Sequence, residues 1–259
     1  MIRRMPRRQF RTALVTGASS GIGEQIARVL ADRGVALTLV ARRADRLDAL
    51  AAELSTKVDV LTADLVSDEG CALIERRLVE QPVDLLVNNA GVGTTGSFHH
   101  LPGQPEFDEV RLNVLALVRL THAALGPMVA AGAGAILNVG SLAGDQPLRG
   151  SATYAATKSF VTTFTESVAA ELRGTCVTIT VVKPGFTYTE INEVGAPDPK
   201  SLAGRMWMQA DFVAREAVDA AERGQLVSVP GVQWKAVNGL VHAMPRSLTR
   251  MITARMSAI

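Results

Sequence analysis

The sequence predicts a single α/β domain built on a doubly wound sheet of about seven parallel strands, with helices on both faces. Short β-rich segments alternate with longer segments whose apolar residues recur at helical spacing. Several of the short segments are apolar throughout, which is typical of strands covered on both faces. A length of 259 residues fits one large domain of this kind.

The predicted elements follow one another in regular alternation. The strand segments are residues 12–16, 36–40, 58–62, 83–87, 134–139, 178–182 and 226–229. The helical segments are residues 22–33, 44–54, 68–80, 104–131, 151–173 and 211–223. In the first of these helices Ile22, Ile26, Val29 and Leu30 share one face, and Gly34 is a typical stop signal.

A glycine-rich turn joins the first strand to the first helix. It reads Thr-Gly-Ala-Ser-Ser-Gly-Ile-Gly over residues 16–23. Glycines let the backbone approach a pyrophosphate closely, and a helix N-terminus offers N–H groups and a positive dipole end. The spacing GxxxGxG resembles the opening motif of the short-chain dehydrogenase/reductase family. The resemblance implies a Rossmann-type domain with cofactor contacts from Gly17, Ser19, Ser20, Gly21, Ile22 and Gly23.

The end of the second strand predicts which dinucleotide binds. An acid there would bind the ribose 2′-hydroxyl, but Ala41 stands at that position and Arg42 and Arg43 follow it. A guanidinium offers a planar fork to a phosphate, so we expect NADP(H) rather than NAD(H). A solvated pair at a helix start is the alternative interpretation. Residues 39–43 and 46–50 also resemble the DltE-like, NADP-dependent branch of the family.

Further cofactor contacts are implied by the resemblance, and all follow predicted strands. An acid at the place of Asp64 faces the adenine in the family, although a residue near a helix N-cap is the alternative here. Thr189 stands where the family holds the nicotinamide carboxamide, with Thr187 as the second choice. The complete implied set is Asp64, Leu65, Asn88, Ala90, Gly91, Pro184, Gly185, Thr187 and Thr189, together with Tyr154 and Lys158.

A tyrosine and a lysine share one face of the predicted helix 151–173. Tyr154 and Lys158 lie four residues apart. A phenol has an ordinary pKa of about 10, and a nearby ammonium and an oxidised nicotinamide would lower it toward the working pH. The spacing YxxxK alone also occurs by chance on surface helices. Ser141, after the fifth strand, adds a hydroxyl that can hold a carbonyl oxygen beside the phenol.

The family's catalytic tetrad is Asn-Ser-Tyr-Lys, and the matching residues here are Asn113, Ser141, Tyr154 and Lys158. By that resemblance, Tyr154 exchanges the proton and Ser141 orients the carbonyl oxygen. Lys158 binds the nicotinamide ribose and lowers the pKa of the phenol, while Asn113 holds a water of the proton relay at a backbone kink. An N-cap role for Ser141 and a helix-kink role for Asn113 are the structural alternatives.

The predicted function is NADPH-dependent reduction of a ketone or aldehyde, or the reverse oxidation of a secondary alcohol. The small-molecule substrate is expected to be lipophilic, because Leu202, Met206, Trp207 and Met208 stand in a long loop of about residues 186–210. A short amphipathic helix on the core is the alternative interpretation of that loop. A non-catalytic NADP-binding regulatory or interaction protein is the alternative function.

Composition excludes other classes of protein. Aromatic residues make up 4% of the chain, which does not favour a base-stacking groove for nucleic acid. Cys71 and Cys176 are interpreted as two buried free thiols, so we expect a reducing, cytoplasmic location. The four histidines lack ligand spacing, and no metal site is predicted. No apolar run reaches about 18 residues, so no transmembrane segment is expected.

The positive charge gathers at the start of the chain. Residues 1–11 carry five arginines and no acid, and removing them from the net charge of +2 leaves −3. A solvated tail is one interpretation, and a weak contact with anionic lipid or nucleic acid is the other. We therefore divide the chain into a basic tail (1–10), a catalytic domain (11–230) and an amphipathic extension of that domain (231–259), expected to form two short helices around Pro245. The family resemblance implies a homodimer or homotetramer through the helices 104–131 and 151–173.

Overall fold

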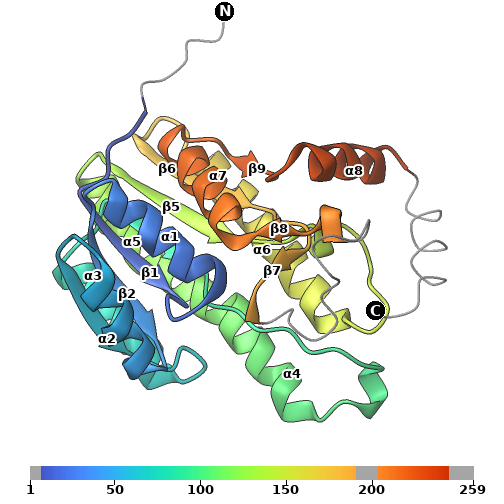
Figure 1. Cartoon of the computed structure of the whole chain (residues 1–259). Helices are drawn as coiled ribbons and strands as arrows, with labels where there is room; N and C mark the ends of the chain where they lie inside the picture. The colour runs from blue at the N-terminus through green and yellow to red at the C-terminus, as the bar shows by residue number, and fades with distance from the viewer. Residues whose placement is uncertain (1–6, 191–203, 245–259) are drawn as a thin grey trace, which may run out of the picture.

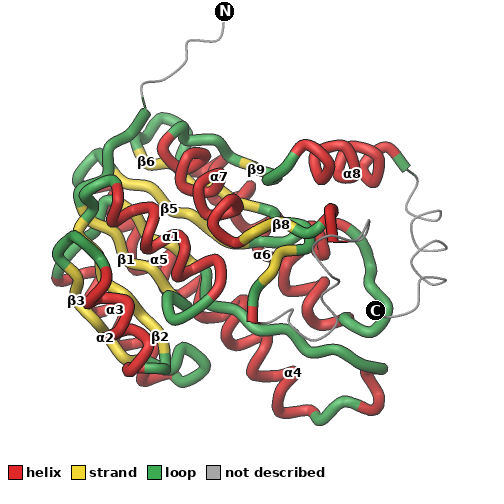
Figure 2. Tube along the Cα trace, in the orientation of Figure 1, coloured by secondary structure: helices red, strands yellow, loops and turns green. Residues whose placement is uncertain are grey.

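The computed structural model describes residues 7–190 and 204–244 and confirms the predicted fold class. A seven-stranded parallel sheet has the order β3-β2-β1-β4-β5-β6-β9 (Figures 1 and 2). Its strands are β1 (Thr12–Thr16), β2 (Ala36–Ala41), β3 (Val58–Thr62), β4 (Leu85–Asn88), β5 (Gly134–Val139), β6 (Val177–Val182) and β9 (Val227–Ser228). The strand order reverses between β1 and β4, which is where open sheets of this kind bind ligands.

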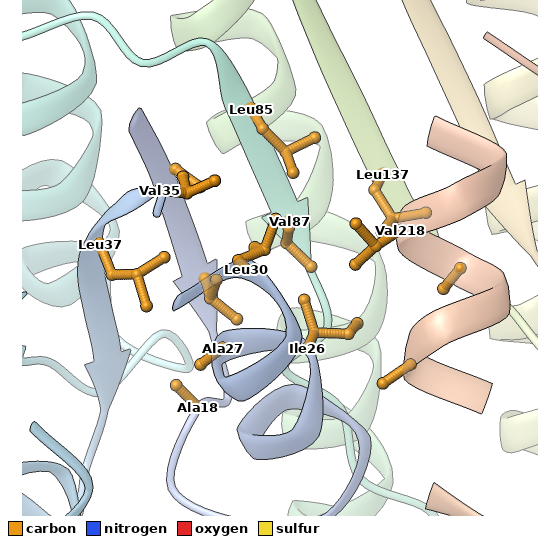
Figure 3. Packing of buried hydrophobic residues seen from close by; sticks show 14 of the residues in the cluster. Ala18, Ile26, Ala27, Leu30, Val35, Leu37, Leu85, Val87, Leu137 and Val218 are labelled. Carbon is orange, nitrogen blue, oxygen red and sulfur yellow. The ribbon is translucent and has the colours of Figure 1, made fainter. Parts of the chain in front are cut away.

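Helices cover both faces of the sheet. On one face lie α1 (Gly21–Asp32), α2 (Ala44–Glu53) and α7 (Ala210–Glu222), and Figure 3 shows Ile26 and Leu30 of α1 packed between the sheet and α7. On the other face lie α3 (Asp68–Glu80), α5 (Leu117–Ala130) and α6 (Ala152–Glu171). Strands β1, β4 and β5 are buried almost completely between these layers, as their continuous apolar character predicts.

The helix predicted over residues 104–131 is interrupted. It divides into α4 (Gly103–Val110), a π-helical turn η2 (Arg111–Ala116) and α5, so the extra residue of the π turn changes the direction in which side chains point. The whole run Gly103–Ala130 is long and apolar enough to cross a membrane by length and composition. Core helices pass the same test, and this run packs on α3, α6 and the sheet, so the finding is weak support for a membrane span.

Residues 7–10 lie against the domain, which corrects the interpretation of residues 1–10 as a free solvated tail. The Arg7 guanidinium lies 3.4 Å from the Asp219 carboxylate, the Arg8 guanidinium donates to the Cys176 carbonyl oxygen at 2.8 Å, and Phe10 is buried in the core. The remaining residues of that segment lie outside the described part of the chain. Cys71 is buried as predicted, but Cys176 is exposed because it lies in the turn before β6.

Smaller elements complete the carboxyl edge of the sheet. They are η1 (Phe98–His100), η3 (Leu142–Asp145), η5 (Gly204–Met206) and the two-stranded ladder of β7 (Thr187–Tyr188) with β8 (Met208–Gln209). Leu202 lies outside the described residues, whereas Met208 packs into a small core with Val213 and Trp234. The extension contains one described helix, α8 (Val232–Ala243), and the second expected helix also lies outside the described residues.

Candidate active site

A cleft of about 430 Å³ opens at the carboxyl edge of the sheet, around the reversal between β1 and β4. It collects residues that lie far apart in the sequence, as expected for a ligand site in an open α/β sheet. The predicted residues that line it are Gly17, Ser19, Ser20, Gly21, Ile22, Arg42, Arg43, Asp64, Leu65, Ala90, Gly91, Ser141, Tyr154, Lys158, Pro184, Gly185, Thr187 and Thr189. Three predicted residues, Gly23, Asn88 and Asn113, lie behind this lining.

The glycine-rich turn needs its glycines for two reasons. Gly17 and Gly21 have φ angles of 65° and 60°, a conformation that costs little only in glycine. A Cβ on Gly17 would lie 2.8 Å from the Ala90 Cα atom. A Cβ on Gly23 would lie 2.2 Å from the Asn89 amide nitrogen, so Gly23 allows α1 to pack on the loop after β4.

Arginines stand at the end of the cleft that follows β2. Arg42 is exposed, whereas the Arg43 guanidinium donates to Ser19 Oγ at 3.0 Å and to Ser20 Oγ at 2.8 Å. Arg43 also forms an ion pair at 2.9 Å with Glu190, and Arg46 pairs with the same carboxylate. Hydrogen bonds from Arg46 and then from Arg43 lower the pKa of Glu190 to about 2. Glu190 and Arg46 were absent from the predicted set, because Glu190 is 144 residues from Arg46 in sequence.

Asn88, the last residue of β4, and Asn89, the residue after it, make different contacts. Asn88 is buried and donates to Thr121 Oγ1 and Asn138 Oδ1, both at 3.0 Å, which ties β4 to α5 and β5. Its predicted place beside the adenosine ribose stays a prediction. The amide nitrogen of Asn89 donates to the carbonyl oxygens of Thr16 and Gly17, and Asn89 lines the cleft. Sequence reasoning passed over Asn89, although it stands in the same motif.

The carboxylate of Asp64 is engaged in a local turn. Asp64 Oδ1 accepts from the Val66 N–H at 3.1 Å, while the side chain of Leu65 is buried. The local contact fits the alternative interpretation of Asp64 as a residue near the N-cap of α3, and Asp64 also lies in the cleft lining. Its contact with the adenine stays a prediction.

Tyr154, Ser141 and Lys158 meet at the other end of the cleft. Ser141 precedes η3, accepts from the Ala143 N–H at 3.1 Å, and is hydrogen-bonded to the Tyr154 side chain. Lys158 is buried, and its Nζ donates to the Val139 carbonyl oxygen at 3.0 Å and lies 5.7 Å from the centroid of the Tyr154 ring. The ion pair of Lys183 with Asp145, both buried, joins the end of β6 to η3 and so supports Ser141.

The acidities of the two catalytic candidates are shifted by burial. Burial raises the pKa of Tyr154, the Ser141 hydrogen bond lowers it, and the charge of Glu109 raises it. Burial lowers the pKa of Lys158 to about 8, against a smaller raising effect of Glu109. The net direction for Tyr154 is opposite to the expected lowering by Lys158 and an oxidised nicotinamide, because within the chain burial of the phenol outweighs the other contributions.

Asn113 occupies the π-helical turn η2, which accounts for the predicted kink. Its Oδ1 accepts from the Val92 N–H at 3.0 Å, and its Nδ2 donates to the Val92 carbonyl oxygen at 2.8 Å and to Thr157 Oγ1 at 3.1 Å. A Cβ on Gly91 would lie 3.1 Å from Asn113 Oδ1 and 3.5 Å from Lys158 Nζ. Asn113 and Lys158 therefore both lie close to Gly91.

An aromatic cluster lies beside the segment that was expected to hold the nicotinamide. A Cβ on Gly185 would lie 2.2 Å from the Trp234 ring, so only glycine fits there. Phe186 stacks on Trp207 with 5.3 Å between centroids and meets Trp234 edge-on, and Tyr188 contacts Trp207. Phe186 is half exposed, which leaves an apolar surface next to the cleft.

Within residues 7–190 and 204–244, no cluster of three or more histidine, cysteine or acidic side chains is placed to bind a metal ion. The cleft is lined instead by a glycine-rich turn, two arginines, the partly buried Tyr154 and the buried Lys158.

The chain is similar to known proteins in sequence and in fold. The family model described as short chain dehydrogenase matches residues 11–199. Sulfoacetaldehyde reductase 2 of Chromohalobacter salexigens is 39% identical over 224 residues, which cover 81% of this chain and 84% of that protein.

Two solved structures extend the similarity over nearly the whole chain. A short-chain dehydrogenase from Sphingobium yanoikuyae in complex with NADPH has a TM-score of 0.79 and 35% identity, covering 98% of this chain and 99% of that one. The bulky-bulky ketone specific alcohol dehydrogenase of Comamonas testosteroni has a TM-score of 0.78 and 32% identity, covering 93% and 97%. The chain belongs to the short-chain dehydrogenase family.

Proposed function

We propose that the protein is an NADPH-dependent carbonyl reductase that reduces a ketone or aldehyde, or catalyses the reverse oxidation of a secondary alcohol. The observation that carries the proposal is the meeting of Tyr154, Ser141 and Lys158 at one end of a cleft whose other end presents Arg42 and Arg43. The family is one of oxidoreductases. Members that are similar to this chain use NADP(H), among them the relative solved with NADPH.

The cleft fits a dinucleotide with a 2′-phosphate. The φ angles of Gly17 and Gly21 favour glycine, and a Cβ at these positions would crowd Ala90 and Thr189, so glycines let the turn lie close to its neighbours in the cleft. Arg42 and Arg43 would hold the 2′-phosphate, and Thr187 and Thr189, which also line the cleft, would hold the nicotinamide amide. When bound, NADPH supplies the hydride that the reduction requires.

The chain's own residues handle the proton and the orientation of the substrate. Ser141 holds the carbonyl oxygen beside the phenol of Tyr154, and Tyr154 donates its proton to that oxygen. The buried ammonium of Lys158 stabilises the negative charge that forms on the phenol. Lys158 in turn is held by the Val139 carbonyl oxygen, and its helix is tied through Thr157 to Asn113.

A lipophilic substrate is supported by the aromatic cluster. Only 4% of the residues of the chain are aromatic. The cluster nevertheless contains both tryptophans, together with Phe186 and Tyr188. They stand next to Gly185 and Thr187 of the cleft, and the similar alcohol dehydrogenase of Comamonas testosteroni is specific for bulky-bulky ketones. We therefore expect ketones with two large apolar substituents to be reduced best.

Assembly and location are part of the same proposal. The helical run α4–α5 and α6 expose four apolar side chains, namely Val110, Leu115, Val129 and Phe160. Pairing of these helices in a homodimer or homotetramer would cover them. A cytoplasmic location agrees with two free cysteines, one of them exposed.

The test is NADPH consumption with a panel of ketones of increasing bulk, beside small aldehydes and sugars. We expect turnover with the bulky apolar ketones and at least tenfold weaker kcat/KM with NADH. Tight NADPH binding without turnover of any carbonyl compound or alcohol would support the regulatory alternative and contradict the proposal.

A further inference from the structure

Two buried carboxylates lie behind the catalytic tyrosine and have no place in the family's tetrad. Glu106 and Glu109 of α4 are 5% and 0% exposed. Neither forms an ion pair with a cation among residues 7–190 and 204–244, and each has one carboxylate oxygen without a hydrogen-bond partner there. Burying an unpaired carboxylate costs folding free energy, so the sequence retains both groups at the expense of stability.

Glu109 holds the segment that follows β4. Its Oε2 accepts from the Thr94 N–H at 2.9 Å and from Thr94 Oγ1 at 2.8 Å. Four residues further on, Asn113 binds both the N–H and the carbonyl oxygen of Val92. Two side chains of one helical run therefore fix this segment on either side of Gly93.

Gly93 is the point where the segment contacts the phenol. A Cβ on Gly93 would lie 2.9 Å from Cδ2 of the Tyr154 ring, so the backbone itself packs against that ring. Glu106 contacts the residue before Tyr154, since its Oε2 accepts from the hydroxyl of Thr153. Glu109 thus fixes the backbone segment beside the Tyr154 ring, and Glu106 contacts the first turn of α6, the helix that carries Tyr154.

We propose that Glu109 is a positioning residue for Tyr154, which it serves by fixing residues 92–94 against the phenol ring, with Glu106 securing the start of α6. This inference rests on the proposed function for its kinetic consequence, but its structural content concerns Tyr154 alone. A neutral amide at position 109 could also accept the two Thr94 hydrogen bonds, so the charge of Glu109 and its hydrogen bonds are separable by substitution.

The negative charge of Glu109 affects the pKa of Tyr154, which a purely structural contact would not do. The groups that act on the phenol from the surrounding elements are Ser141 beside η3 and Glu109 of α4, and Lys158 lies beside its ring on α6. Glu109 itself faces Glu106, Thr94 and Lys158. Because the negative charge of Glu109 raises the pKa of Tyr154, its removal should make the phenol more acidic.

The test uses the fact that the chain has only two tyrosines. In a Tyr188→Phe background, tyrosinate absorbance reports Tyr154 alone. We expect Glu109→Gln to lower the apparent pKa of Tyr154. The matched control is Glu80→Gln, an exposed acid at the end of α3, which should leave the titration unchanged. An unshifted titration in Glu109→Gln would overturn the inference.

Kinetics separate hydrogen bonding from charge. Glu109→Ala should reduce kcat about tenfold or more while NADPH affinity stays within about twofold, and Glu109→Gln should restore kcat to within about threefold. Thr94→Val gives the same test from the partner side, should Glu109→Ala fail to fold, and Thr94→Ser is its control. Unchanged kcat in both Glu109→Ala and Thr94→Val would also overturn the inference. If the wild-type chain reduces no carbonyl compound, the proposed function fails, and the tyrosinate titration still decides the role of Glu109.

Discussion

The two ends of the cleft differ in how far their charged side chains are exposed to water. At the end beyond β2 the charges face water: Arg42 is exposed, and the Arg43 and Glu190 side chains are 40% and 39% exposed. At the other end Lys158 and Glu109 are buried, and the pKa of each is shifted by burial. Charge at the first end can attract and release a phosphate, whereas charge at the second end changes the acidity of its neighbours.

The difference follows from where each group sits in the fold. Arg43 stands just before α2 at the rim of the sheet, where its partner Glu190 can be replaced by another anion. Lys158 and Tyr154 stand in the first half of α6, which packs against η2 and η3, so small movements there are costly. Substitutions at the buried end should therefore change rates, and substitutions at the exposed end should change affinity.

The largest expected effect is that of Tyr154→Phe. Removing the hydroxyl removes the proton donor and should lower kcat about 100-fold to 10,000-fold, since general acid catalysis contributes that much. The cofactor's adenosine half would bind at the other end, so NADPH affinity should stay within about twofold. Steady-state kinetics and a fluorescence titration with NADPH measure the two quantities. A variant that retains most of its turnover would place the proton donor elsewhere.

The pH dependence of reduction is the second test. Burial lowers the pKa of Lys158 to about 8, so the ammonium is present below that pH and is lost above it. The charge that forms on Tyr154 then lacks its stabilising partner, and kcat/KM for carbonyl reduction should fall as pH rises through about 8. Lys158→Met should have a low rate without this limb. If that variant keeps the same decline, another group is titrating.

At the exposed end the expected effects are on cofactor choice. Arg42→Ala and Arg43→Ala should each weaken NADPH binding about tenfold, because a charge-assisted hydrogen bond to the 2′-phosphate is lost. Binding of NADH should not change, and the loss should shrink at high salt. Arg76→Ala, which removes an exposed arginine of α3 outside the cleft lining, is the control. Equal weakening of NADH and NADPH would contradict a role in phosphate recognition.

The smallest effect is expected for Glu190→Gln. Glu190 binds Arg43 and Arg46 and so competes with a phosphate for the same guanidinium groups. Removing its charge should tighten NADPH binding about twofold to threefold, since exposed ion pairs contribute little. The measurement is the ratio of NADPH to NADH dissociation constants, and a weaker affinity for NADPH would show that Glu190 supports binding.

Local patterns were sufficient for the sheet but not for the details that depend on distant contacts. The strands β1, β3 and β5 agree with their predicted bounds because each is a short β-rich segment. The ladder of β7 with β8 was not predicted, since two-residue strands far apart in sequence leave no periodic signal. The π-helical turn was also missed, because one extra residue in a long apolar helix barely changes its period.

The site divides in the same way. Tyr154, Lys158 and Ser141 follow from spacing and from family resemblance, and the structure brings them together. Glu109 was not among the predicted residues, because its burial depends on a segment that only the tertiary structure brings over α4. Asn89 lines the cleft although it was not predicted, whereas Asn88 ties β4 to β5, and which of two adjacent asparagines faces the cleft cannot be read from sequence alone.

The central claim is that Tyr154 protonates a carbonyl that receives hydride from NADPH in this cleft. The most direct measurement is the transfer of deuterium from C4-deuterated NADPH to a bulky ketone, followed by mass analysis of the alcohol. The account predicts one deuterium on the carbinol carbon, formed by the wild-type chain and nearly lost in Tyr154→Phe. Alcohol without deuterium, or equal labelling by both proteins, would contradict it.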